Sequence, residues 1–373
     1  MRPIAALSLI PMVLVAGSAL AAEPTDDAAR NHWRQLPSLP DPVGYGGMFA
    51  GVLNGRLVAG GGSQFRDKPK WLGGDKQFSD RIFTLQSTGG PWVEHPRRLP
   101  VKVGHFASAA TEDAIYLAGG VSESGCRHEV WRITARGDDF EFTRLADLPH
   151  PVGYAAAEIV GGRLYVVGGI AAPDSKSAGT ETWSLAIEPI DAAAQWQRHD
   201  DMPGPGVHVA AAAKFGDDLY LLGGIGFDDS GTPRPSKSFY CFDTLSGTWE
   251  QLSDLPEPRV GPASPCPVID GRILVIGGYA TVFPGPPREH PGFAAKTLLY
   301  DLTRNSWRPG PLLPTTPAAD RDAPGDSGPA PMIAAPCCFW RDQVVVVGGE
   351  VRASVRTPSV LALPLNAVSS DAP

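Results

Sequence analysis

Short runs of apolar residues that end in a pair of glycines recur along this chain. Successive glycine pairs are separated by 49 to 71 residues. Asn54-Gly55, Gly161-Gly162 and Asp270-Gly271 precede three of the runs and are typical of tight β-hairpin turns, which need residues with positive φ. We therefore expect each run to be the second strand of a hairpin. The six runs are Leu57–Ala59, Ile115–Ala118, Leu164–Val167, Leu219–Leu222, Ile273–Ile276 and Val344–Val347.

A second repeated pattern lies between the glycine pairs, an aromatic residue followed after six others by proline. Another apolar run precedes each aromatic residue, such as Phe239–Phe242 before Trp249. Each repeat thus predicts four short strands. Four strands in about 50 residues are typical of a propeller blade, and blades stack radially around a channel. The aromatic and proline pairs are Trp33/Pro40, Phe142/Pro149, Trp196/Pro203, Trp249/Pro256 and Trp307/Pro314, with Trp92/Pro100 one residue longer.

The two patterns do not begin and end together along the chain. Trp33 and Pro40 precede the first glycine pair, whereas only the strand Val360–Leu365 follows the last pair. The sixth blade therefore lacks its outer strand. We predict that the segment around Trp33 supplies this strand and leaves no open seam. The fold class expected is all-β, a six-bladed propeller in a single domain over 33–365, with a C-terminal tail over 366–373.

Composition agrees with a folded chain rich in turns. The 373 residues include 43 Gly and 38 Pro, which in a polar chain would indicate disorder. Hydrophobic residues make up 43% and charged residues only 19%, enough to bury a core. Long helices are disfavoured, because Gly costs about 1 kcal/mol and Pro about 3 kcal/mol in a helix interior.

Residues 1–22 resemble a secretory signal peptide. Arg2 precedes an apolar run from Ile4 to Val15, and Ala19–Ala21 form an A-x-A cleavage site. The run is too short to span a bilayer, although an uncleaved anchor is the alternative. Cleavage would leave 31 basic against 40 acidic residues, a net charge of −9. We expect a periplasmic or secreted protein with no membrane contact after cleavage and no nucleic-acid partner.

The five cysteines do not indicate a metal or disulfide framework. Their number is odd and no C-x-x-C motif occurs, which disfavours a zinc ribbon and a disulfide scaffold.

Comparison of the repeats with one another identifies a charged residue that a blade does not need. The residues that follow the glycine pairs are Gly62, Val121, Ile170, Ile225, Tyr279 and Glu350, so one position of six is charged. Arg356 follows six residues after Glu350. A surface salt bridge within one loop is the alternative to a functional pair. These loops and the loops after each Leu-Pro are expected at the same mouth of the channel, where we place the candidate site.

The fifth residue after each Leu-Pro or Met-Pro proline gives a second series, with Tyr45, His105, Tyr154, His208 and Gly261. These side chains either line a polar pocket or are half-buried residues with backbone partners. Arg259 is expected in the same region. Phe65–Trp71 forms a basic and aromatic loop with Arg66 and Lys68, for which a solvated loop is the alternative.

Two insertions interrupt the repeats. Thr315–Pro331 is rich in Pro, Gly and Asp and is expected to be a mobile segment near the mouth. Thr281–Phe293 is rich in Pro and carries Glu289 and His290.

The glycine pairs and downstream tryptophans from Trp33 to Leu365 resemble the kelch repeat, which implies a fold but no activity. Glu350–Thr357 after Gly348-Gly349 further resembles the stretch with the catalytic Glu and nearby Arg of the bacterial N-acetylneuraminate epimerases, or sialic acid mutarotases. Met48–Gly51, Gly60–Gly62 and Phe65–Pro69 resemble the blade that follows that stretch. Because the order is reversed here, the chain is similar to a cyclically permuted branch of that family. It departs from the family at Arg352, where Lys is usual, at Ala353-Ser354 and in its insertions.

The resemblance implies an isomerase that interconverts α and β anomers of N-acetylneuraminate through the open-chain ketone. An acid and a base suffice, and no metal or cofactor is expected. Glu350, ionised at neutral pH, is the candidate base. Arg356 is expected to bind the sugar carboxylate and orient Glu350, with His105 or His208 as the acid. Tyr45, Arg66, Lys68, Tyr154, Arg259 and Arg352 are candidate substrate-binding residues.

The sequence leaves other functions open. A non-catalytic kelch propeller that binds a carbohydrate or a protein is the main alternative. A copper radical oxidase would need a Tyr-Cys crosslink and two His ligands, for which the sequence offers no obvious arrangement, and a sialidase is disfavoured because no S-x-D-x-G-x-x-W motif occurs. The partner expected is a small sugar acid, and a homodimer is one possible assembly.

Overall fold

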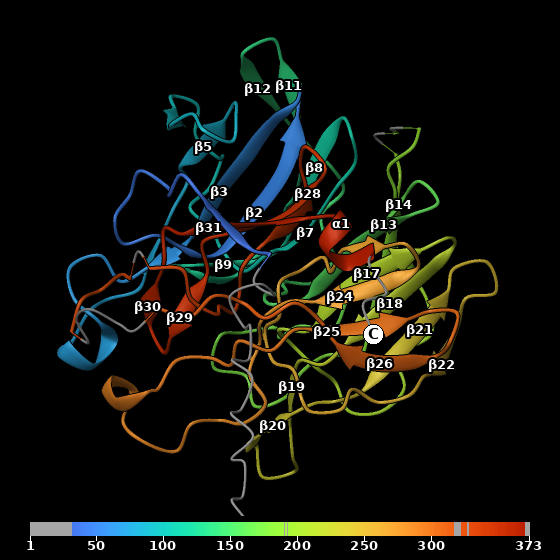
Figure 1. The fold of residues 1–373 in the computed structure, drawn as a ribbon. Helices are drawn as coiled ribbons and strands as arrows, with labels where there is room; N and C mark the ends of the chain where they lie inside the picture. Colours follow the sequence, from blue (N-terminus) through green and yellow to red (C-terminus); the bar gives the residue numbers. More distant parts are fainter. Residues whose placement is uncertain (1–31, 190, 192, 317–321, 327, 370–373) are drawn as a thin grey trace, which may run out of the picture.

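The computed structural model describes residues 32–189, 191, 193–316, 322–326 and 328–369. The predicted signal peptide therefore lies outside the described residues. Six sheets of four antiparallel strands follow one another around a ring in chain order, and this is the predicted six-bladed β-propeller (Figure 1). None of the described helices is long and apolar enough to cross a membrane.

The strands of each blade run in the order a to d from the channel outwards. Blade 1 contains β2 (Gly46–Leu53), β3 (Arg56–Gln64), β5 (Ile82–Leu85) and β6 (Trp92–His95), with β4 (Gln77–Phe78) beside β3. Blade 2 contains β7 (Ala107–Ala110), β8 (Ala114–Ala118), β11 (Val130–Arg136) and β12 (Asp139–Arg144). Blade 3 contains β13 (Ala156–Val160), β14 (Arg163–Val167), β15 (Thr182–Ala186) and β16 (Gln197–Arg198).

The second half repeats this arrangement. Blade 4 contains β17 (Ala211–Phe215), β18 (Asp218–Leu222), β21 (Phe239–Asp243) and β22 (Thr248–Gln251). Blade 5 contains β23 (Val268–Ile269), β24 (Arg272–Val275), β25 (Leu298–Asp301) and β26 (Ser306–Pro309). Blade 6 contains β27 (Cys337–Phe339), β28 (Gln343–Val347), β31 (Val360–Pro364) and β1 (Arg34–Leu36).

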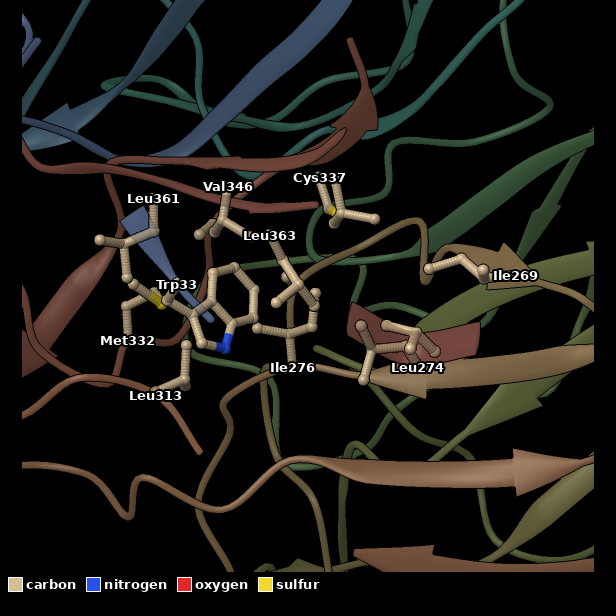
Figure 2. Close-up of a cluster of buried hydrophobic side chains, with 14 of the residues drawn as sticks. Trp33, Ile269, Leu274, Ile276, Leu313, Met332, Cys337, Val346, Leu361 and Leu363 are labelled. Atoms are coloured by element: carbon tan, nitrogen blue, oxygen red, sulfur yellow. The ribbon is translucent and has the colours of Figure 1, made fainter. Parts of the chain in front are cut away.

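The N-terminal strand closes the ring as predicted. β1 pairs antiparallel with β31, with Gln35 opposite Leu361. Trp33 is 7% exposed and lies among apolar side chains of blades 5 and 6, including Leu313, Met332 and Leu361 (Figure 2). The free edge that β31 would otherwise present is thus covered. The predicted tail begins with the one-turn helix α1 (Asn366–Ser369), whose Val368 is buried in the same cluster.

The repeated tryptophans join each blade to the one before it. The indole Nε1 of Trp92 donates to Pro37 O at 2.8 Å, that of Trp196 to Ala146 O at 2.9 Å and that of Trp307 to Ser253 O at 3.0 Å. The Leu or Met before each proline is buried. These residues are Leu39, Leu99, Leu148, Met202, Leu255 and Leu313. The pattern therefore recurs because it fixes neighbouring blades to one another.

The glycine pairs share one backbone conformation, which corrects the count in blade 1. Both glycines are left-handed in every blade, with φ of 62° and 110° at Gly348 and Gly349. In blade 1 the left-handed pair is Gly61 and Gly62, with φ of 64° and 89°. The next residue bridges to the chain that enters the blade, as Glu350 does to Ile333 and Ser63 to Gly46. Ser63, rather than Gly62, is therefore the equivalent of Glu350.

A closed circle of backbone hydrogen bonds surrounds the channel. One residue of each blade donates its N–H to the carbonyl oxygen of the corresponding residue in the preceding blade, and the distances lie between 2.7 and 2.9 Å. All six residues have positive φ. They are Gly47, His105, Tyr154, Val209, Gly261 and Ala334. The count from proline therefore finds His105, Tyr154 and Gly261 correctly, whereas Tyr45 precedes the circle by two residues and His208 by one.

Small hairpins and turns surround one mouth of the channel. The hairpins β9 (Val121–Ser122) with β10 (Gly125–Cys126), β19 (Ile225–Phe227) with β20 (Pro233–Pro235), and β29 (Glu350–Arg352) with β30 (Val355–Arg356) each follow a glycine pair. The turns η1 (Lys70–Leu72) and η2 (Pro287–Glu289) belong to the corresponding connections of blades 1 and 5. Because residues after the glycine pairs bridge to the blade entries, both kinds of loop share this mouth, as predicted.

Candidate functional site

The hairpin β29–β30 places Glu350 directly against Arg356. A register shift between Glu350 and Arg352 brings Glu350 opposite Arg356, and the two side chains form an ion pair. Ser354 closes the hairpin with φ of 62°, and its backbone N–H donates to Glu350 Oε1 at 2.9 Å. The carboxylate is therefore held from two sides, while 18% of its side chain stays exposed at the mouth.

Arg356 is buried more deeply than its partner. It is 2% exposed, its Nε donates to Ser63 O at 3.1 Å, and its guanidinium lies over the Phe65 ring. Burial lowers the pKa of Arg356 to about 10, so the group remains protonated at neutral pH. The second insertion covers this strand, since Asp326 donates its N–H to Arg356 O at 2.9 Å. The described part of that insertion is thus packed against the site.

A series of contacts leads from Arg356 through Ser63 to three rings at the entries of blades 2, 3 and 4. Ser63 Oγ is 3.0 Å from His105 Nε2, and the His105 ring lies 4.6 Å from that of Tyr154. The Tyr154 and His208 rings are 6.2 Å apart. Glu350, Arg356, His105, Tyr154 and His208, five predicted site residues, therefore form one chain of contacts through Ser63.

Both histidines of this chain are neutral at pH 7. Burial and the positive charges of Lys76 and Arg356 hold the pKa of His105 well below its usual value. Burial lowers the pKa of His208 to about 4, although Ile225 opposes this through a backbone hydrogen bond. Neutral imidazoles are weak proton donors, so neither ring fits the predicted general acid well.

Lys76 is a site residue that the sequence analysis missed. Its Nζ donates to Tyr154 Oη at 3.1 Å and lies 5.7 Å from the Tyr154 ring centre. Burial, together with the positive charges of Arg356 and Lys70, lowers the pKa of Lys76 to about 7. A cation of this kind near the mouth favours anionic ligands. In the sequence, Lys76 is indicated only by its position shortly after the basic and aromatic loop Phe65–Trp71.

Two predicted binding residues belong to a different cluster, between blades 6 and 1. Tyr45 has no exposed surface, and its hydroxyl donates to Asp41 Oδ2 at 2.9 Å. Arg66 Nη2 also donates to Asp41 Oδ2 at 2.8 Å, and Arg81 pairs with the same carboxylate. Burial alone would raise the pKa of Asp41, but these hydrogen bonds and charges hold it below its usual value. Tyr45 and Arg66 thus stabilise the junction of the ends of the chain.

The remaining predicted residues lie around the rim. Arg259 is 1% exposed, donates to Glu257 Oε1 at 2.8 Å, and has its pKa lowered by burial. Arg352 is 4% exposed in the hairpin β29–β30, and its charge acts on His290 and Asp322. Lys68 is exposed in the loop before η1.

Glu350 lines a cavity of about 210 Å³ at the mouth. The first insertion forms its other walls with Phe283, His290 and Phe293, and Tyr279 adds a further ring. Asp322 of the second insertion accepts from Trp71 Nε1 at 3.3 Å and from Arg288 Nε at 2.7 Å. The two insertions and η1 are thereby joined beside the hairpin β29–β30 (Figure 1). Taken together, the mouth offers a fixed carboxylate, buried cations and aromatic side chains.

Comparison with known proteins supports the kelch resemblance. Residues 210–256, which cover blade 4, match the Kelch motif family model. The chain is 25% identical to Kelch-like protein terF of Aspergillus terreus over 260 residues, or 66% of this chain and 52% of that protein. It is 22% identical to Beta-scruin of Limulus polyphemus over 325 residues, 82% of this chain and 33% of that protein.

Kelch-like protein 36 of Bos taurus is 25% identical over 308 residues, 77% of this chain and 43% of that protein. The chain thus spans between a third and about half of the length of these three relatives. None of the three is named for an action on sialic acid.

Proposed function

We propose that this six-bladed propeller, which resembles kelch-repeat proteins, is a mutarotase that interconverts the α and β anomers of N-acetylneuraminate or a close relative of that sugar acid. The observation that carries the proposal is the Glu350–Arg356 pair. It occurs at one of six equivalent blade positions, its carboxylate lines a cavity at the mouth, and its sequence resembles the catalytic stretch of sialic acid mutarotases.

The proposed reaction needs one base and one acid. Glu350 takes the proton from the anomeric hydroxyl, the bond between the anomeric carbon and the ring oxygen breaks, and the ring oxygen receives a proton. The open-chain ketone then rotates, and the hydroxyl attacks the opposite face of the carbonyl as the proton transfers reverse. Nothing is oxidised or reduced, and the product is an isomer of the substrate. A positioned acid or base contributes typically about 10²–10⁴-fold.

We assign the proton donor to Lys76 rather than to a histidine. Its pKa of about 7 suits a group that gives and takes a proton near neutral pH, whereas His105 and His208 are neutral there. The carboxylate and the ring oxygen of the sugar acid share the anomeric carbon. One lysine that attracts the carboxylate is thus within reach of the ring oxygen. Arg356, already paired with Glu350, positions the base in this scheme.

An exported location accords with the proposal. If residues 1–22 direct the chain to the periplasm or the medium, it meets sialic acid where it is released as the α anomer. Mutarotation there supplies the equilibrium mixture faster than the uncatalysed reaction.

The proposal is tested by following the anomers by NMR after a sialidase releases α-N-acetylneuraminate. We expect wild type to accelerate equilibration over buffer, and Glu350→Gln to lose about 10²-fold or more of the acceleration. Glu123→Gln, which removes an exposed carboxylate from the turn of the hairpin β9–β10 at the same mouth, is the matched control and should retain activity. An inactive wild type would overturn the proposal, and a fully active Glu350→Gln would overturn only the assignment of the base.

The alternative is a propeller that binds ligands without chemistry. The deep burial of Arg356 favours this alternative, because an ion pair that stabilises the hairpin needs no catalytic role. Under this alternative wild type and buffer give equal equilibration rates, while a sugar acid still binds at the mouth.

A further inference from the structure

The cavity next to Glu350 is built by a segment that the repeat does not require. Phe283, His290 and Phe293 come from the insertion after the glycine pair of blade 5. Tyr279 takes the place in blade 5 that Glu350 takes in blade 6, because both bridge to the entry of their own blade. The insertion therefore adds a wall to the mouth next to Glu350.

Aromatic side chains make up much of the wall of this cavity. The Tyr279 and Phe293 rings stack with centres 5.9 Å apart, and His290 packs edge-on to Phe283 at 5.1 Å and to Phe293 at 5.0 Å. Burial and the positive charge of Arg352 lower the pKa of His290, so its ring is neutral at pH 7. Its Nδ1 accepts the N–H of Gly292 at 3.0 Å. His290 thus adds an uncharged ring to the aromatic part of the wall.

The charges around the cavity disfavour a cationic ligand. Aromatic enclosures bind quaternary ammonium groups when no neighbouring cation opposes them. Among the described residues that line the cavity, Glu350 is the one carboxylate, and it is paired with Arg356, while Arg352 is close enough to act on His290. An uncharged, largely apolar group is therefore the ligand that suits these walls.

We propose that this cavity binds the N-acyl group of the sugar acid and makes the protein selective for N-acylated substrates. The inference rests on the proposed function, because the sugar ring must lie over Glu350 for its substituent to reach the aromatic walls. The volume of about 210 Å³ is far more than one water needs. An N-acetyl group fills only part of it, so the cavity also accepts longer acyl chains.

Binding of three sugar acids tests this inference without depending on catalysis. The ligands are N-acetylneuraminate, its N-butanoyl analogue and the analogue with a hydroxyl in place of the amide. Saturation-transfer NMR should give the strongest signal at the acyl methyl protons. The N-butanoyl analogue should bind at least as tightly as N-acetylneuraminate, since each buried methylene contributes about 0.8 kcal/mol, or roughly fourfold.

Variants separate the cavity from the rest of the mouth. Phe283→Ala with Phe293→Ala should weaken both N-acyl ligands about tenfold and leave the hydroxyl analogue unchanged. Phe283→Leu, which keeps an apolar side chain without a ring, guards against misfolding and should give a smaller loss. Leu245→Ala, at a side chain that is 80% exposed in the turn between β21 and β22 of blade 4, is the control.

The outcomes distinguish the two proposals. Equal weakening of all three ligands, no signal at the acyl methyl, or tighter binding of tetramethylammonium than of N-acetylneuraminate would each overturn the acyl cavity. Acyl selectivity without faster anomer equilibration would overturn the mutarotase function and leave the cavity assignment intact. Equally faster equilibration of the hydroxyl analogue and of N-acetylneuraminate would overturn the acyl cavity and leave the mutarotase function intact.

Discussion

At the scale of single residues, Lys76 shows how a side chain suited to the site destabilises the fold. The pKa of Lys76 is about 7 against an ordinary value of 10.5. Between these pH values the unfolded chain binds the proton more tightly, so stability rises with pH across that window. Below pH 7 the lysine is charged in both states and the whole cost of burying it applies.

Replacing Lys76 with Met should therefore raise stability and lower activity at once. At pH 6 we expect a gain of up to ~2 kcal/mol in the free energy of unfolding, because partial exposure offsets much of the burial cost. The gain should shrink toward pH 10.5, which urea unfolding at several pH values measures. Anomer equilibration should fall about 10²-fold in the same variant. A variant with unchanged activity would remove Lys76 from the proposed mechanism.

The sequence predicted the charged pair but not all of its surroundings. Glu350 was found because five equivalent positions are uncharged, and Arg356 because it lies in the same hairpin. Ser63 was missed because the glycine pair of blade 1 is Gly61-Gly62 rather than Gly60-Gly61. Lys76 was missed because it lies in a long connection of blade 1 that has no counterpart in the repeat. Tyr45 and His208 were assigned to the series by a constant distance from proline, whereas the entries of blades 1 and 4 are longer by two residues and one. Loop length is set by local turns, which the spacing of apolar residues does not determine.

At the scale of elements, the closing strand β1 completes the sixth blade and joins the two ends of the ring. β1 contributes only three residues, so its backbone bonds alone would hold it weakly. Trp33 adds the buried surface that anchors it between blades 5 and 6 (Figure 2). The sequence was sufficient to predict this junction because five of the six aromatic-to-proline pairs follow a glycine pair, whereas the first, at Trp33, precedes all of them. The mouth hairpins were not predicted, because pairs of two or three residues leave no periodic signal.

Trp33→Ala should loosen the ring at this junction. Loss of a buried tryptophan leaves a cavity and costs ~3–5 kcal/mol, and β31 would then present an open edge. We expect a lower urea midpoint and concentration-dependent aggregation, measured by circular dichroism and light scattering. Trp33→Phe keeps most of the apolar contact and should lose less than half as much. A loss below ~1 kcal/mol for the alanine variant would mean that the strand closes the ring without its anchor.

At the scale of the whole molecule, the circle of six backbone hydrogen bonds links all blades at the channel. Each blade donates one N–H and accepts through one carbonyl, so every blade has a partner on both sides only when the ring is complete. All six residues are left-handed, yet only Gly47 and Gly261 are glycines. The four others hold a conformation that costs roughly 1 kcal/mol or more each, and the composition gave no sign of it. Two of them, His105 and Tyr154, place their aromatic side chains in the candidate site. The position of the site therefore depends on closure of the propeller.

The two glycines of the circle provide a matched test of that link. Alanine at either position pays the cost of positive φ, about 1 kcal/mol, since φ is 69° at Gly47 and 65° at Gly261. At Gly261 a Cβ meets Ile333 at 3.3 Å, which a small adjustment relieves, whereas at Gly47 it lies 2.4 Å from His105 Nδ1. Gly47→Ala should therefore lose ~2–3 kcal/mol or more in urea unfolding, against about 1 kcal/mol for Gly261→Ala. It should also shift the His105 imidazole signals in NMR and slow anomer equilibration, because the ring that packs on Tyr154 must move. Equal losses in the two variants, with unchanged His105 signals, would show that the circle tolerates the added methyl group and that the site does not depend on it.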